Sequence, residues 1–277
     1  MQRGHHMRIS FILSAALLCS SACTDQREEV ASEPRIQFQR ASADLVSHGK
    51  RVADVLGCTG CHGSDLTGED WSEPGFGKLW TANLTRAAAR YSDEQLADVI
   101  TSGVRPDREL WEMPSHLFTH LTQEDMSAVI AYLRSTPPSG AVHPEPVFEE
   151  GARREIAAGT FTSSAAQVKK EGSAWPPDAG EPHALGRYIV RGTCAECHGM
   201  PLRGGQPNPE AKPRPDLRMV ASYEPEQFRR LLRTGIAPGD REVSLMSEVA
   251  RGRYKHLTDA ELDAVYRYLK RVAEIDP

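Results

Sequence analysis

Two short runs of the sequence place cysteine and histidine at one fixed spacing. The pattern Cys-x-x-Cys-His occurs as Cys58, Cys61 and His62, and again as Cys194, Cys197 and His198. Two thiols three positions apart can each form a thioether with a vinyl group of one haem, and the histidine that follows can bind the iron from one side. The sequence therefore predicts two covalently attached haem c groups, held by these six residues.

Two other chemistries also use paired cysteines. An even number of cysteines in an exported chain can form disulfides, but disulfides give no reason for a histidine directly after each pair. Two cysteine pairs can also make one zinc site, and that interpretation leaves both histidines without a role. Haem attachment accounts for all six residues.

The two motifs belong to a longer internal repeat. The matching segments are Tyr91 to Leu96 with Tyr223 to Phe228, Asp107 to Glu109 with Asp240 to Glu242, His120 to Thr122 with His256 to Thr258, and Tyr132 and Leu133 with Tyr268 and Leu269. The separation is 136 residues at the cysteines and again at the last of these segments. These are two copies of one domain.

Each copy is predicted to be mostly helical. Apolar residues at helical spacing indicate a helix from about Ala43 to Leu56 that leads into the first motif, with Ala184 to Arg191 as its counterpart. A capping box that begins at Ser92 predicts a middle helix, which ends at a glycine. The closing helices are expected to begin at Thr122 and Thr258, and a capping box is predicted at the second of them.

The iron of each haem has a second axial position, and the sequence offers a methionine for it in both copies. Met113, followed by Pro114, lies in the loop before the closing helix of the first copy, and Met246 lies at the aligned place in the second. The rival ligands are His116 and His120 in the first copy, and Met219 and His256 in the second. His120 and His256 stand just before helix caps, where a hydrogen-bonding role is the simpler interpretation.

The N-terminal residues carry a secretory pattern. Met7 to Cys23 has a basic start, a short apolar stretch and small residues before a cut point. The residues before Cys23 resemble a lipobox, in which that cysteine becomes the lipidated N-terminus, and a cut near Ala22 without lipid is the alternative. We therefore expect a periplasmic protein whose membrane contact is a lipid anchor at Cys23.

Composition and the repeat set the domain organisation. The 277 residues are 39% apolar and 26% charged with a net charge of −5, and the lack of a basic excess argues against nucleic acid as a partner. No apolar run of about 18 residues follows residue 25, so no membrane span is expected in the mature chain. The expected parts are a signal peptide (1–23), a polar tether (24–41), a first domain (42–139), a Pro-rich, semi-stiff linker (140–180) with a short helix near 149–158, and a second domain (181–277).

On these motifs the chain resembles a class I cytochrome c repeated twice, over residues 42–136 and 182–273. The segments Gly186 to Val190 and Tyr132 to Pro138 are also similar to cytochrome c subunits of bacterial periplasmic dehydrogenases, which usually carry three haems. The resemblance implies an all-α fold of two tandem cytochrome c-like domains, His/Met-ligated iron, and electron transfer without substrate turnover. One departure is Ser247, which follows Met246 where the family usually has proline.

The expected function is a dihaem carrier between a periplasmic oxidoreductase and a respiratory acceptor. Its expected partners are redox proteins: a periplasmic dehydrogenase, a terminal oxidase or a small carrier. The alternatives are an electron-transfer subunit of a dehydrogenase complex, a dihaem enzyme of the peroxidase or thiosulfate dehydrogenase kind, and a redox-sensing module. An enzyme needs an open iron or an unusual ligand, whereas both copies offer methionine, so no catalytic residue is predicted.

Charge differs between the copies. Residues 40–139 carry 14 acidic and nine basic side chains, whereas residues 181–277 carry 14 acidic and 16 basic ones. One hypothesis is that the copies dock different partners, the second facing an acidic one through salt-sensitive steering. The alternative is an ordinary solvated surface.

Overall fold

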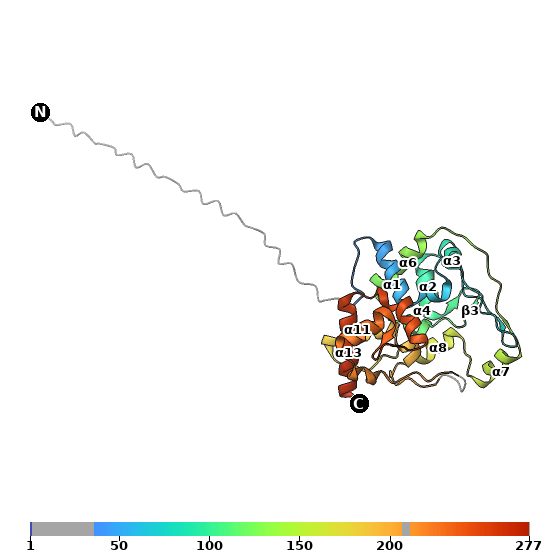
Figure 1. Ribbon diagram of the computed structural model, residues 1–277. Coiled ribbons are helices and arrows are strands. Elements are labelled where there is room, and N and C mark those ends of the chain that lie inside the picture. Colours follow the sequence, from blue (N-terminus) through green and yellow to red (C-terminus); the bar gives the residue numbers. More distant parts are fainter. Residues whose placement is uncertain (2–35, 207–210, 277) are drawn as a thin grey trace. The chain divides into compact units, whose positions relative to one another are not determined.

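Two sets of helices follow one another along the chain and repeat the same order (Figure 1). The computed structural model describes residues 36–206 and 211–276, together with Met1. The predicted signal peptide, Cys23 and most of the predicted tether lie outside the described residues. No helix among the described residues is long and apolar enough to cross a membrane.

The first copy contains six helices and three short strands within the described residues. They are α1 (Leu45–Leu56), α2 (Cys58–His62), β1 (Gly77–Lys78), α3 (Leu84–Arg90), α4 (Asp93–Ser102), β2 (Val104–Arg105), β3 (Arg108–Glu109), α5 (Ser115–Phe118) and α6 (Gln123–Ser135). The second copy follows the same plan. Its elements are η1 (Glu181–His183), α9 (Ala184–Gly192), α10 (Ala195–His198), η2 (Leu217–Ser222), α11 (Pro225–Thr234), β5 (Ile236–Ala237), β6 (Arg241–Glu242), α12 (Leu245–Gly252), η3 (Tyr254–His256) and α13 (Asp259–Ile275).

The predicted caps are present. The Ser92 side chain accepts from the amide of Gln95, whose side chain accepts from the amide of Ser92, and α4 ends at Gly103 in the left-handed conformation. Thr258 and Glu261 form the same reciprocal pair at the start of α13. Each box satisfies amides that the first helical turn leaves without partners, which fixes where the helix begins.

The segment between the copies is part of the fold. It contains β4 (Val147–Phe148), the predicted short helix as α7 (Glu150–Ala158), and an additional helix, α8 (Ser164–Glu171). β4 pairs with β1 of the first copy, and the ring of Trp111 packs against Phe148 and Phe161 at centroid distances of 4.8 and 4.9 Å. The prolines predicted a semi-stiff connection, but Phe161 is buried and Phe148 packs with it against Trp111 of the first copy.

The first and last helices of each copy form its core. α1 packs against α6, and α9 packs against α13 (Figure 1). Gly49 and Gly186 allow this close approach, because a Cβ at either position would lie within 2.5 Å of a backbone oxygen on the partner helix. Residues of both copies meet in one buried cluster, and Ile36–Pro277 forms a single compact unit. The predicted boundaries between domains and linker stay a prediction.

Residues 36–39, called the strap below, lie between the copies. Phe38 is 1% exposed, its amide donates to Asp125 at 3.1 Å, and the next amide, of Gln39, donates to Glu261 at 2.7 Å. The two carboxylates occupy the same position in α6 and α13. Tyr188 of the second copy donates to Asp125 at 2.7 Å, and Arg51 of the first pairs with Glu261 at 2.7 Å. Buried acids are thus paired across the interface.

Candidate haem-binding sites

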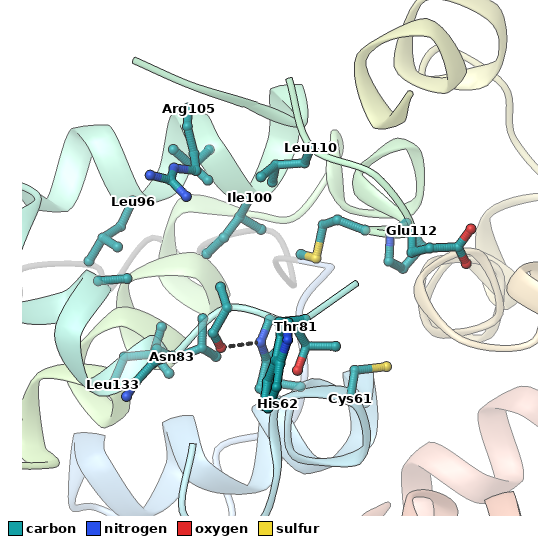
Figure 2. Close-up of a pocket in the computed structure, with 18 of the residues that line it drawn as sticks. Cys61, His62, Thr81, Asn83, Leu96, Ile100, Arg105, Leu110, Glu112 and Leu133 are labelled. Atoms are coloured by element: carbon teal, nitrogen blue, oxygen red, sulfur yellow. Dashed lines mark hydrogen bonds between the residues drawn. The ribbon is translucent and has the colours of Figure 1, made fainter. Parts of the chain in front are cut away.

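One cavity of about 370 Å³ opens beside the first motif. Its walls include Cys58, Cys61 and His62 of α2, together with Met113 from the loop that precedes α5. The structure therefore brings together the four residues that the sequence predicted for the first haem, although the loop is distant along the chain. Figure 2 shows Cys61 and His62 on the helix that forms one side of this cavity.

Hydrogen bonding prepares the His62 ring as a metal ligand. Its Nδ1 donates to the carbonyl oxygen of Ala82 at 2.8 Å, drawn as a dashed line in Figure 2. The bond fixes the tautomer, so Nε2 keeps its lone pair for iron. Burial lowers the pKa of His62, against the opposing effect of the bond to Ala82, and so favours the neutral imidazole that a metal requires.

The carbonyl that orients His62 is held by a helix cap. Asn83, the next residue, accepts the amide of Arg86 at 3.2 Å as the N-cap of α3. Its amide group donates in turn to the carbonyl oxygens of Ser139 and Ala141, at 2.8 and 3.0 Å. The start of the segment between the copies therefore fixes the loop that positions the histidine.

The cysteines of both motifs carry free thiols, which thioether attachment requires. Burial raises the pKa of Cys58 to about 12 and also raises the pKa of Cys61, so both thiols are protonated at neutral pH. All four cysteines of the described residues are free, which differs from the disulfide alternative. Within the same residues, no group of three or more histidine, cysteine or acidic side chains forms a metal cluster.

The rival ligands of the first copy lie elsewhere. Met113 lines the cavity, whereas neither His116 nor His120 does. The carbonyl oxygen of His116 accepts from Arg191 at 2.9 Å, and the His120 ring packs against Trp175 at a centroid distance of 4.9 Å. Met126 also lines the cavity, in addition to lying in one apolar cluster with Leu121.

The remaining cavity wall suits a flat apolar ring with two carboxylates. Leu96, Ile100, Trp80 and Trp111 supply apolar surface (Figure 2 labels Leu96 and Ile100), and Arg86, Arg90, Arg105 and Arg108 line the same cavity. The Nε of Arg105 is buried and has no hydrogen-bond partner. Burial and the neighbouring Arg105 cation lower the pKa of Arg108. Arg105 and Arg108 also pair with Asp107 and Glu145, so the positive charge of this wall is partly balanced. A wall with four guanidinium groups fits the propionates of a haem, so the residues present fit the group.

The second motif repeats this local geometry. His198 is 9% exposed, and its Nδ1 donates to the carbonyl oxygen of Pro215 at 2.8 Å, just as His62 does to Ala82. The residues four positions after each histidine, Leu66 and Leu202, both have positive φ angles, 62° and 59°. Burial lowers the pKa of His198 and raises the pKa of Cys194.

The second methionine has a different setting. Met246 lies in the first turn of α12, where the first copy has its methionine before a proline. Ser247 is fully buried and donates to the carbonyl oxygen of Gly235, and it accepts from the amide of Val243. The serine that replaces the family's proline thereby fixes the loop by hydrogen bonds.

The rivals in the second copy are an exposed methionine and a histidine that contacts the first copy. Met219 is 40% exposed. His256 lies beside α1 of the first copy, where Asp54 and Lys50 influence its pKa, which burial lowers. Its carbonyl oxygen accepts from Arg51 at 3.2 Å.

Several wall residues were missed by sequence reasoning. The segment after the first copy lines the cavity with Val142, His143, Pro144 and Pro146, and the second copy contributes Glu196 and Arg253. Neither group has a motif. The rings of Trp80 and His143 stack with their centroids 4.5 Å apart. Aromatic residues in loops were therefore the sequence signal that could have indicated these wall residues.

The arginines that make the second copy basic are paired. Each of five lies within ion-pair distance of a carboxylate of the same copy: Arg229, Arg230, Arg233, Arg251 and Arg253. These five residues therefore do not supply a free cationic patch, and docking of an acidic partner stays a hypothesis.

Two families of known proteins match the two copies of this chain. Residues 46–137 match the family described as Cytochrome c, and residues 181–269 match the family described as Cytochrome C oxidase, cbb3-type, subunit III. Each copy is a cytochrome c domain. The matched ranges contain both Cys-x-x-Cys-His motifs, and the helical content fits the predicted fold class. Covalent haem c is the cofactor that these domains imply.

Longer relatives align with most of the chain. The chain is 23% identical over 258 residues to the fructose dehydrogenase cytochrome subunit of Gluconobacter japonicus, covering 82% of this chain and 52% of that protein. It is also 23% identical over 278 residues to the cytochrome c subunit of alcohol dehydrogenase (quinone) of Gluconacetobacter polyoxogenes, covering 87% and 58%. The chain thus spans about half the length of these curated relatives.

Proposed function

We propose that this protein binds two haem c groups and carries electrons from a periplasmic dehydrogenase to a respiratory acceptor. The observation that carries the proposal is the single cavity in which Cys58, Cys61, His62 and Met113 meet. The names of the relatives support a dehydrogenase as the donor, because each is the cytochrome subunit of such an enzyme. The thioether ligands proposed for the iron support a respiratory acceptor of high reduction potential.

Bound haem would supply a one-electron redox couple, and the residues around it would fix its position and its reduction potential. The two cysteines of each motif would anchor the ring, and the Ala82 and Pro215 carbonyls orient His62 and His198 as the residues that would bind iron. A thioether ligand from Met113 or Met246 favours the reduced iron and so raises the potential. A high potential suits transfer towards an oxidase, and a fully ligated iron leaves no position for a substrate.

The arginines of the first cavity would stabilise the propionates. Arg105 and Arg108 hold positive charge in a part-buried wall, and the adjacent tryptophans exclude water from the ring. Fixed groups of this kind need little rearrangement when charge changes, which keeps the barrier to electron transfer low.

We further propose a periplasmic location with Cys23 as a lipid attachment point. The pattern of Met7 to Cys23 supports this, and the first described residues, from Ile36 onward, begin the strap between the copies. Mass spectrometry of the mature N-terminus tests it. A diacylated Cys23 is expected, and an unmodified Cys23 at the start of the mature chain, after a cut near Ala22, would contradict the anchor.

The first experiment is spectroscopy of the ferric, haem-loaded protein. We expect the weak near-infrared band from sulfur to iron and low-spin EPR signals from both sites. A band of half the expected intensity would mean that one methionine is not a ligand. A high-spin iron would contradict the carrier proposal and make a dihaem enzyme the better interpretation.

A further inference from the structure

The second attachment motif lies at the wall of the first cavity. Glu196, which stands between Cys194 and Cys197, lines the cavity that holds Cys61. Arg253, at the end of α12, lines it as well. Residues that would hold one haem thus adjoin residues that would hold the other, although the motifs are distant in sequence.

One guanidinium connects the two motifs. Arg253 donates through Nε to the carbonyl oxygen of Val55 at 3.2 Å and through Nη2 to that of Leu56 at 2.8 Å. These are the last two residues of α1, directly before Gly57 and the first motif. The Nη1 of Arg253 donates to Glu196 at 2.6 Å. A cation at a helix C-terminus is favourable, and its charge-assisted bond to the carboxylate is strong.

Gly57, the residue directly before the first motif, leaves room for the guanidinium of Arg253. A Cβ on Gly57 would lie 2.6 Å from the Cζ of Arg253, and the φ angle of Gly57 is +88°. Both the space and the backbone conformation therefore require glycine. The side chains of Arg253 and Glu196 are 14% and 30% exposed, so water screens the pair only in part.

The contact has a counterpart with different chemistry. Counted back from the cysteine motifs, Val55 corresponds to Arg191, and counted back from His120 and His256, Leu117 corresponds to Arg253. Arg191 donates to the carbonyl oxygen of Leu117, and Arg253 donates to that of Val55. Such exchanged contacts are the signature of a two-fold interface. Of these two arginines, Arg191 bonds carbonyl and hydroxyl oxygens, while Arg253 also binds a carboxylate inside a haem-attachment motif.

We propose that Arg253 is a positioning residue shared by the two haem sites, which fixes their spacing and sets the equilibrium for passing an electron between them. The inference rests on the proposed function, because it needs both haems. In that step one electron leaves the ferrous iron of one site and enters the ferric iron of the other, and no bond or proton changes. A ferric haem carries one more positive charge than a ferrous one, so a nearby fixed cation favours the ferrous state.

The test is an optical redox titration of the haem-loaded full chain. Arg253→Gln is compared with Arg251→Gln, a change on the same helix whose arginine pairs with Glu242 on the surface at 3.0 Å. We expect R253Q to lower the one-electron reduction constant of the first site about tenfold, which equals about 59 mV. R251Q should titrate like the unchanged protein.

Glu196→Gln tests the same pair without touching α12. Removal of the carboxylate should raise the potentials, and the R253Q/E196Q double variant should return towards the original values. R253K should recover part of the shift, because it keeps the charge and loses the branched contact.

Haem content separates failure of this inference from failure of the function. If the unchanged protein binds fewer than two haems by pyridine haemochrome, the proposed function is wrong and the coupling falls with it. If two haems are bound and R253Q, E196Q and R251Q all titrate alike, the coupling alone is overturned.

Discussion

The two cytochrome c domains share the scaffold around the histidine and differ in what surrounds it. His62 and His198 donate to equivalent backbone carbonyls at the same distance of 2.8 Å. By contrast, Arg105 of the first cavity corresponds to Ala237, a buried residue of the second domain. The attachment motif is thus present in both domains, while the charge around it differs. Because axial ligands, burial and charge all set haem potentials, the two sites should differ in potential.

Removal of either cysteine pair should have the largest effect, because it should leave only one of the two domains with a covalently attached haem. The double variant Cys58→Ala/Cys61→Ala should lose one covalent haem, and Cys194→Ala/Cys197→Ala should lose the other, because each pair forms the two thioethers of its own haem. Haem staining and pyridine haemochrome should give half the original content for either variant. Full content in one of them would show that its motif does not hold a haem.

The methionines test whether the two axial positions are equivalent. Met113→Ala should halve the near-infrared sulfur band and lower the potential of one site, because a thioether ligand favours ferrous iron. Met246→Ala should do the same despite its place within α12. Met219→Ala, at an exposed methionine, is the matched control. An unchanged band in the Met246 variant would mean that the second iron has another ligand.

Arg191 sharpens the comparison at the interface, since its counterpart in the first domain is Val55. Arg191 is 1% exposed, and its bonds include one to Gly172 at 2.9 Å. Arg191→Met leaves buried oxygens without donors, so the free energy of unfolding should fall by about 3 kcal/mol. Arg187→Met, whose arginine pairs with exposed Asp178, should cost about 1 kcal/mol or less. Denaturant titration compares them, and equal losses would contradict the interface role.

His48 predicts the smallest asymmetry in stability, because Leu185, directly before Gly186, takes its place in the second domain. The ring is 5% exposed and its Nδ1 has no partner. Burial, followed by the Arg51 cation, lowers its pKa below the ordinary 6.5, against the opposing effect of Asp125. The folded protein therefore binds this proton less readily than the unfolded chain, and stability should decline as the pH falls below 6.5. His48→Gln should flatten this slope, and an unchanged slope would assign it to other groups.

Helix starts and the haem motifs were open to prediction from local sequence. Ser92 pairs with Gln95, and Thr258 pairs with Glu261, each three residues further along the chain. Both capping boxes form as expected. The packed segment after the first domain was not foreseen, because its prolines masked apolar residues such as Phe148 and Phe161 whose partner, Trp111, lies in a distant loop. No spacing rule predicts that the Ala82 carbonyl orients His62.

The sequence by itself determined the attachment chemistry, the duplication and the helical architecture, because each depends on residues only a few positions apart. Thioether attachment, capping boxes and amphipathic spacing are short-range properties. The tertiary structure alone placed Met113 in the cavity that His62 lines, and it placed Arg253 between α1 and Glu196. Those contacts join segments far apart along the chain, and only the packing of the two domains brings them within bonding distance.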